Sequence, residues 1–262
     1  MNRKNHHYFL LKNSPWPLIL SLNSFNFISS LGIFFKFSNF FILSFSVVIL
    51  SVCSFFWWVN YLKEFSMGGS SSFNLEHGIK FSMILFILSE IFFFFSFFWA
   101  YFHFFLRPVL ENGFSWPSHR ILAFESMNVP LLNTLILLSS GVTITIRHFY
   151  SNKGLRKNFN IFIFLTLILG VTFSFFQLQE YKRSFFRLRD GNYGSSFFLL
   201  TGFHGLHVII GSTFLLVVLI FSITSNSPSK NNFLRMDLSS WYWHFVDVIW
   251  IFLYFFLYYL VD

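Results

Sequence analysis

The chain is poor in three things that most water-soluble proteins contain. Its single cysteine, Cys53, excludes an internal disulfide and any metal site built on a pair of cysteines. Charged residues make up 11% of the 262 positions, whereas a typical soluble domain has about 25%. Alanine occurs at Ala100 and Ala123 alone. These shortages exclude an ordinary cytosolic enzyme, a disordered chain and a secreted disulfide scaffold.

Apolar residues occupy the positions that charged residues leave. Hydrophobic residues are 55% of the chain, aromatic residues are 24%, and phenylalanine alone occurs 45 times. The mean hydropathy is +0.62. A transmembrane helix needs about 20 mostly apolar residues. By that criterion the sequence predicts an all-α polytopic membrane protein with seven transmembrane helices, at 15–35, 38–58, 81–105, 129–146, 159–177, 196–221 and 239–260.

The loop between the second and third apolar runs divides the chain. It contains the flexible sequence GGSSS at 68–72. We therefore predict an N-terminal part with the tail and first two helices (1–66), a linker loop (67–80) and a five-helix bundle (81–262).

The distribution of basic residues predicts the orientation in the membrane. The net charge of +8 comes from residues in short loops, which fits membrane topology and gives no sign of nucleic-acid binding. With seven spans, 11 of the 18 Lys and Arg residues lie on the N-terminal side. The positive-inside rule then places the N-terminus on the cytoplasm-like side, which is the matrix in a mitochondrion. The abundance of Phe, Asn and Ile, which have AT-rich codons, favours an organelle genome.

Glu90 is the most unusual residue, because it lies inside the third apolar run. A carboxylate near mid-membrane costs about 2.5–3.5 kcal/mol on insertion scales, so it must be protonated, paired or reached by water. It either handles protons or forms a structural hydrogen bond. Ser82, Ser89, Ser96 and His103 follow one another at seven-residue intervals, which predicts a polar stripe for helix packing on a different face of the same helix.

Two other helices carry histidines. His244 and Asp247 lie three residues apart on one helix face and can hydrogen-bond. They form a structural pair, a zinc second shell or a proton relay. His204, His207 and Gly211 also share a face. Two histidines three residues apart on a helix can bind metal or haem. The neighbouring glycines instead favour close packing of another helix, with the histidines hydrogen-bonded across the contact. His148 and His103 end their helices on opposite sides, so we expect no shared ligand site and no metal.

The end of the second apolar run indicates an interfacial anchor. Aromatic residues and charges gather where a head group would lie. A phospholipid head group could bind there, although a generic anchor explains the same residues. The candidates are Trp57, Trp58, Lys63, Glu64 and Lys80.

Several long motifs resemble one family, subunit III of cytochrome c oxidase. The resemblance extends from Ser14 to Tyr254. It rests on SPWP (14–17), the Trp pair at 57–58 followed by Glu64, MILFILSEIFFFFSFFWA (83–100), VPLLNT (129–134), SGVTIT (140–145), DGNYGSSFFLLTGFHGLHVIIGSTFL (190–215) and WYWHFVDVIWIFLY (241–254).

The resemblance implies a non-catalytic core subunit of the complex that reduces oxygen to water and pumps protons. It implies two plus five helices around a lipid-filled cleft, in the mitochondrial inner membrane. Haem and copper would belong to the partner subunits, and structural phospholipids to this chain. Subunit I would be the main contact, with subunit II and accessory subunits in the same complex. The chain would stabilise subunit I and support proton uptake.

The resemblance also bears on single residues. Glu90 matches the carbodiimide-reactive carboxylate of the family. The other acids and histidines at family positions are Glu64, His103, His148, Glu180, His204, His207, His244 and Asp247. Ser70 and Ser71 stand where the family commonly has a His pair, and Lys63 and Lys80 stand where Arg is frequent. These departures affect head-group recognition most, because lysine lacks the bidentate geometry of arginine.

The sequence leaves three alternatives to a subunit of cytochrome c oxidase. The equivalent subunit of a quinol oxidase would look similar. A stand-alone proton channel or transporter would show repeats and broken helices at mid-membrane. A haem-binding cytochrome would need histidines at matched depth on facing helices.

Overall fold

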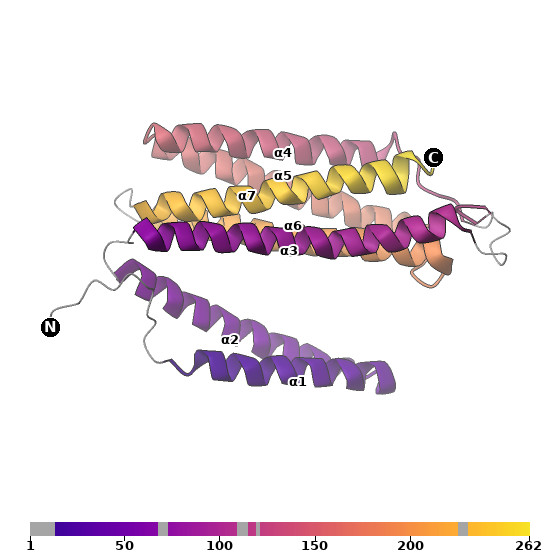
Figure 1. Cartoon of the computed structure of the whole chain (residues 1–262), viewed down its shortest axis with the longest axis horizontal. Coiled ribbons are helices and arrows are strands. Elements are labelled where there is room, and N and C mark those ends of the chain that lie inside the picture. Colours follow the sequence, from indigo (N-terminus) through magenta and orange to yellow (C-terminus); the bar gives the residue numbers. More distant parts are fainter. Residues whose placement is uncertain (1–13, 68–72, 109–114, 119–120, 225–229) are drawn as a thin grey trace. The chain divides into compact units, whose positions relative to one another are not determined.

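The computed structural model describes residues 14–67, 73–108, 115–118, 121–224 and 230–262, with side chains undescribed at 61–67, 73–75, 152 and 230–233. All regular structure in these ranges is helical (Figure 1). The helices are α1 (Trp16–Phe37), α2 (Phe40–Met67), α3 (Phe73–Leu106), α4 (Val129–Asn152), α5 (Arg156–Arg183), α6 (Gly191–Thr224), α7 (Lys230–Leu253) and a terminal π-helical turn, η2 (Tyr254–Tyr259).

Seven of these helices are long and apolar enough to cross a membrane, which confirms the predicted fold class. Each predicted span lies within a helix or, for the last, within α7 and η2, apart from one or two residues at the ends. The helices extend beyond the apolar runs. For example, α6 begins at Gly191, ahead of the predicted start at 196. Polar and aromatic residues at the membrane surface continue the helix beyond its apolar part. A prediction based on apolar length alone therefore misses these end residues.

Contacts divide the chain into two units, residues 1–79 and 80–262, with the boundary in the first turns of α3. The predicted arrangement of two helices and five helices around a lipid-filled cleft stays a prediction. So do the predicted domain limits, and part of the linker lies outside the described residues.

In the first unit, α1 and α2 pack as a helical hairpin. Ser38 closes α1 in the left-handed region, at φ 55°, and its N–H donates to the Phe34 carbonyl. Ser30 and Ser46 join the two helices by a buried hydroxyl contact of 2.6 Å. The Asn23 amide donates to Cys53 Sγ at 3.2 Å. These contacts give polar residues of the first apolar run partners within the hairpin.

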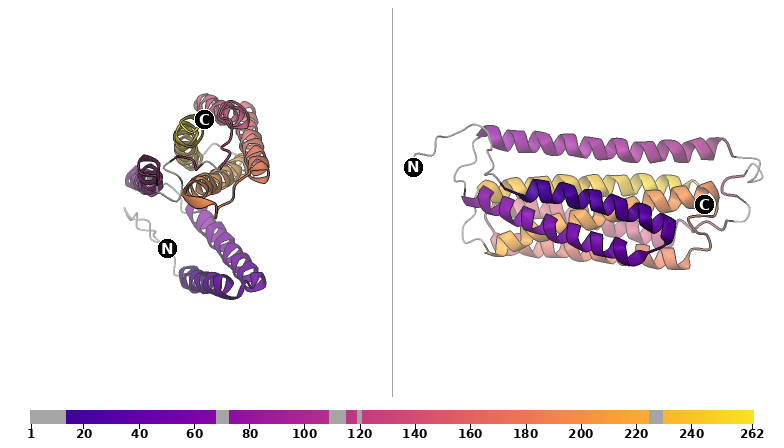
Figure 2. Two further views of the ribbon diagram at one scale, coloured as in Figure 1. Left: turned by 90° about the vertical axis from the view of Figure 1, so that its right-hand side faces the viewer. Right: turned by 90° about the horizontal axis from the view of Figure 1, so that it is seen from below.

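In the second unit, α4, α5, α6 and α7 form a ring, and α3 lies beside it (Figure 2, left). Trp243 of α7 is completely buried inside the ring, and its indole N–H donates to Ser140 Oγ of α4 at 2.9 Å. A Cβ added at Gly170 of α5 would lie 2.8 Å from this indole, and one at Gly211 of α6 would lie 3.0 Å from it. The two glycines therefore make the space in which one tryptophan contacts all three neighbouring helices.

The prediction of close packing by glycines on α6 is thus correct at Gly211 but not at its neighbours. An added Cβ would meet nothing within 4 Å at Gly205, and it would make an ordinary contact of 3.9 Å with Tyr181 at Gly202. Of these three glycines, Gly211 alone faces a tightly packed ring.

The end of α7 is fixed by tyrosines from other helices. The backbone N–H of Leu260 donates to the Phe255 carbonyl at 3.0 Å, five residues earlier, as in a π-helix. The last four carbonyl groups of a helix receive no hydrogen bond from the helix itself. Here Tyr101 of α3 donates to the Phe256 carbonyl at 2.8 Å and Tyr193 of α6 donates to the Leu257 carbonyl at 3.3 Å.

Candidate functional site: buried polar contacts of the five-helix unit

Glu90 of α3 meets His207 of α6. Glu90 Oε2 lies 2.9 Å from His207 Nε2, and the two side chains are 22% and 10% exposed. Aromatic rings surround the contact, with Phe93 packed edge-on against Phe203 at 5.0 Å and Phe94 against the His207 ring at 5.0 Å. The carboxyl therefore lies in apolar surroundings with one polar partner.

The second nitrogen of His207 fixes how many protons the pair holds. Nδ1 lies 2.7 Å from the Phe203 carbonyl, and a carbonyl oxygen can only accept, so Nδ1 carries a hydrogen. One further proton then sits between Nε2 and Glu90. The pair is either a neutral acid with a neutral imidazole or a carboxylate with an imidazolium. Its net charge is zero in both forms, which removes the cost of an isolated charge in the membrane.

The sequence predicted a hydrogen bond or a proton-handling role for Glu90, and it predicted that His207 bonds across a helix contact. It gave no signal that the two residues are partners. His204 differs from the expectation. Both of its ring nitrogens lack a hydrogen-bond partner among the described residues, and its ring packs against Phe173 and Trp250.

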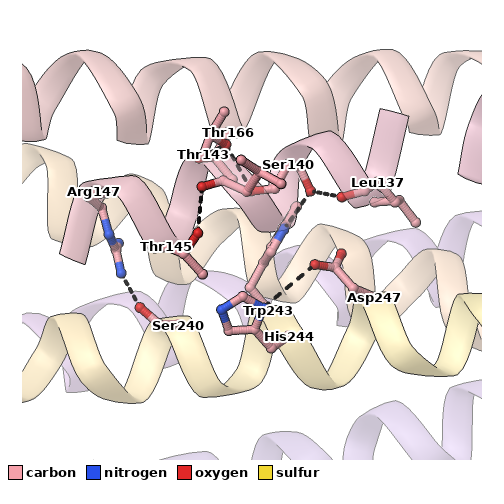
Figure 3. Close-up of polar contacts among 11 residues, drawn as sticks. Leu137, Ser140, Thr143, Thr145, Arg147, Thr166, Ser240, Trp243, His244 and Asp247 are labelled. Atoms are coloured by element: carbon pink, nitrogen blue, oxygen red, sulfur yellow. Dashed lines mark hydrogen bonds and ion pairs between the residues drawn. The ribbon is translucent and has the colours of Figure 1, made fainter. Parts of the chain in front are cut away.

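Asp247 of α7 points toward α4 (Figure 3). It is 7% exposed, and neither carboxyl oxygen has a hydrogen-bond partner in the described chain. A Cβ added at Gly141 of α4 would lie 2.9 Å from Asp247 Oδ2. The absence of a side chain at Gly141 thus provides the room that the carboxyl occupies.

The expected hydrogen bond between His244 and Asp247 is not formed. His244 Nδ1 lies 4.0 Å from Asp247 Oδ2, which exceeds hydrogen-bond distance. The carboxyl lies against Gly141, and a Cβ added at Gly141 would also lie 4.0 Å from His244 Nδ1. The ring, whose side chain is 42% exposed, therefore lies beside the carboxyl without a hydrogen bond to it.

A second polar group lies at the end of this unit where α7 begins. Asp237 contacts Lys80 of α3 and His148 of α4, each at 3.5 Å. Beside it, the guanidinium of Arg147 is completely buried and donates to Ser240 Oγ and to the Met236 carbonyl (Figure 3). These contacts join the start of α3, the end of α4 and the start of α7.

The predicted polar stripe on α3 is exposed. Ser89, Ser96 and His103 all lie on the exposed face, and the two hydroxyls donate to carbonyls of their own helix at 2.7 Å. Among the described residues of the second unit, the stripe packs against no other helix. A contact with another subunit stays a prediction.

The head-group candidates belong to two different units of the chain. Trp58 is 58% exposed at the end of the second span, and Trp57 is partly buried. Lys80 contacts Asp237 and lies at the start of α3. The side chains of Lys63 and Glu64, and both Ser70 and Ser71, lie outside the described residues.

No three His, Cys, Asp or Glu side chains in the described ranges gather closely enough to hold a metal ion. His148 shares an end of the unit with Lys80, because both contact Asp237. His103 lies far along α3, since the interval from Lys80 to His103 corresponds to about 34 Å of helix. The two histidines are thus at opposite ends, as the sequence predicted.

Comparison with known proteins agrees with this architecture. The sequence model of the family described as "Cytochrome c oxidase subunit III" matches residues 6–261. The chain belongs to the cytochrome c oxidase subunit III family. Relatives named "Cytochrome c oxidase subunit 3" from Tetraodon nigroviridis and Equus caballus are each 42% identical over 97% of both chains. A relative of the same name from Rhipicephalus sanguineus is also 42% identical, over 97% of this chain and 98% of its own.

Membership of the subunit III family establishes the chain as a subunit of a respiratory oxidase with several transmembrane helices. The likeness extends over 97% of the chain and includes the segments that carry Glu90, His207 and Asp247. The matched relatives are subunits of a cytochrome c oxidase by name, which favours that complex over a quinol oxidase.

Proposed function

We propose that the chain serves cytochrome c oxidase as a subunit without a redox centre, which supports proton uptake and stabilises subunit I. The observation that carries the proposal is the Glu90–His207 pair. It is a buried site that shares one proton between two helices and keeps zero net charge. The proton can move from one partner to the other without changing the net charge of the pair, so the site can hold a proton between two helices without an isolated charge in the membrane.

Three histidines already contact other side chains or are enclosed by aromatic rings, which supports a chain without haem or copper of its own. His207 contacts Glu90 and the Phe203 carbonyl, and His148 contacts Asp237. His204 is enclosed by Phe173 and Trp250. Haem and copper would then belong to the partner subunits.

The placement in the cell and in the complex forms part of the same proposal. Seven spans and the excess of basic residues on the N-terminal side support a mitochondrial inner-membrane protein with its N-terminus in the matrix. The exposed stripe of Ser89, Ser96 and His103 on α3 offers small polar residues to a neighbouring subunit. Subunit I would be the main contact, with subunit II and accessory subunits around it.

Glu90→Gln in the assembled oxidase tests the proton role. Glutamine keeps the shape and can still donate to His207 Nε2, but it cannot release a proton. We expect electron transfer from the donor to oxygen to stay within about twofold of the wild type, because no electron passes through this chain. We expect proton uptake during turnover to slow several-fold. Stopped-flow measurements with a pH dye give both rates.

Ser212→Ala is the matched control, because Ser212 lies on α6, the helix of His207, and its hydroxyl donates to the Ile209 carbonyl of the same helix at 2.7 Å. It should leave both rates unchanged. Abolished electron transfer in a fully assembled Glu90→Gln complex would contradict a chain without a redox role. Normal proton uptake in that complex would show that the pair is structural.

We also propose that a phospholipid binds near the end of the second span, because Trp58 is exposed there at the level of the lipid head groups. Native mass spectrometry of the solubilised complex should show less retained phospholipid in Trp58→Leu. Phe55→Leu, exposed one turn earlier on the same helix, serves as the control for lost apolar surface. Equal lipid retention in both variants would contradict a specific site.

A further inference from the structure

Three polar side chains are buried together where α5 meets η2. Gln177, Glu180 and Tyr258 are 5%, 3% and 1% exposed. The Tyr258 hydroxyl lies beside the Glu180 carboxyl and the Gln177 amide. Even so, none of the three side chains meets a partner at hydrogen-bond geometry within the described residues. This group is separate from Glu90 and Asp247, and the proposed proton role does not use it.

The backbone around Tyr258 is fixed, so the tyrosine cannot easily move closer to its neighbours. Tyr258 belongs to the π-helical turn, and Tyr101 and Tyr193 bond the adjacent carbonyls of Phe256 and Leu257. π-Helical turns frequently occur at functional sites. On the other side, Tyr181 contacts Thr201 Oγ1 at 2.7 Å, so α5 is tied to α6 next to Glu180.

Buried polar groups are almost always hydrogen-bonded to protein or to ordered water. An unpartnered carboxylate in such surroundings is strongly disfavoured, whereas a neutral carboxyl beside water is tolerated. A buried water typically makes about three hydrogen bonds. Gln177, Glu180 and Tyr258 can offer it donors and acceptors from three side chains.

We propose that these three residues form an internal water-binding site in which Glu180 carries an exchangeable proton. Water bridges the Glu180 carboxyl, the Gln177 amide and the Tyr258 hydroxyl. Glu180 lies in the last turn of α5, and Tyr258 lies in the last turn of the α7–η2 helix. The site is therefore near the end of the unit opposite Asp237, and we expect its water to exchange with solvent from that end.

Infrared difference spectroscopy of the intact oxidase during exchange from H2O into D2O tests the site. A protonated carboxyl gives a C=O band that shifts when its proton is replaced by deuterium. We expect such a band to exchange within minutes, to be absent in Glu180→Gln and to be displaced in Tyr258→Phe. Tyr254→Phe is the matched control, because that hydroxyl lies on the same turn but contacts the Ser126 carbonyl at 3.5 Å. It should leave the band in place.

The result that would overturn the proposal is a full set of carboxyl bands in Glu180→Gln, which would mean that Glu180 is ionised. A Glu180 band that resists exchange for hours would also overturn it, since the site would then be dry. If Glu180→Gln fails to assemble, the comparison of Tyr258→Phe with Tyr254→Phe decides. Equal spectra for those two variants count against the site.

Discussion

At the scale of single residues, the placement of acids depends on what faces them across a helix contact. Glu90 faces a histidine that can share its proton, whereas Asp247 faces the backbone of Gly141 and finds no hydrogen-bond partner in the described chain. The sequence marked both acids as unusual because charged residues are rare inside apolar runs. It could not name their partners, because a neighbour 117 residues away leaves no local pattern.

The contact between Gly141 and Asp247 makes a prediction at this scale. Gly141→Ala places a Cβ 2.9 Å from Asp247 Oδ2, so the carboxyl must shift. The carboxyl is the end of a side chain, and the cost should lie near the lower limit for overpacking, about 1 kcal/mol. In an Asp247→Ala background the same substitution should cost much less, which a double-mutant cycle measures.

The readout is the thermal release of this chain from the solubilised complex. Equal costs of Gly141→Ala with and without Asp247 would show that the two residues do not contact each other.

At the scale of helices, apolar length predicted the number and approximate limits of the spans, because about 20 apolar residues are needed to cross a bilayer. Residues 191–195, which precede the predicted sixth span, are helical all the same. The π-helical turn at 254–259 has no sequence signal that we recognised, since Tyr, Phe and Leu continue the apolar run without interruption. The packing role of Gly211 was predicted, but its partner Trp243 was not.

Gly170→Ala tests the packing around Trp243. The added Cβ would lie 2.8 Å from a buried, rigid indole that Gly211 and Ser140 hold on other sides. The indole cannot move away from the new methyl group, so we expect the folded chain to be destabilised by about 2–3 kcal/mol. Gly205→Ala, where an added Cβ meets nothing within 4 Å, should be neutral or slightly stabilising.

Thermal release of the chain measures both variants under the same conditions. Similar release temperatures for Gly170→Ala and Gly205→Ala would contradict the tight packing of the ring.

At the scale of the whole chain, contacts near the C-terminus join distant segments. The Ser126 hydroxyl and backbone N–H donate to Asp262 Oδ2 at 2.6 and 2.9 Å. These hydrogen bonds hold the pKa of the Asp262 carboxyl below its usual value of 3.8. A lowered pKa means that the ionised form is the bonded one. The contact is therefore fully present above the usual value and is lost as the pH falls through the lowered pKa.

Hydrogen exchange at Ser126 checks this link. The Ser126 amide should be protected at neutral pH and should lose protection only in acid, as the pH falls below the usual aspartate value of 3.8 and through the lowered pKa of Asp262. Asp262→Asn should weaken protection already at neutral pH, and Asp190→Asn should not, because Asp190 bonds its own loop at Arg187. Full protection of Ser126 in Asp262→Asn would show that another group holds this amide.

We propose that this chain supports an oxidase while its own side chains bind no redox metal. The most direct test isolates the complex through a tag on this chain in mild detergent, records its optical spectrum and copper content, and then strips the chain away. We predict that haem and copper copurify with the complex and stay with the other subunits when this chain is removed. Haem or copper that remains on the isolated chain would contradict the account.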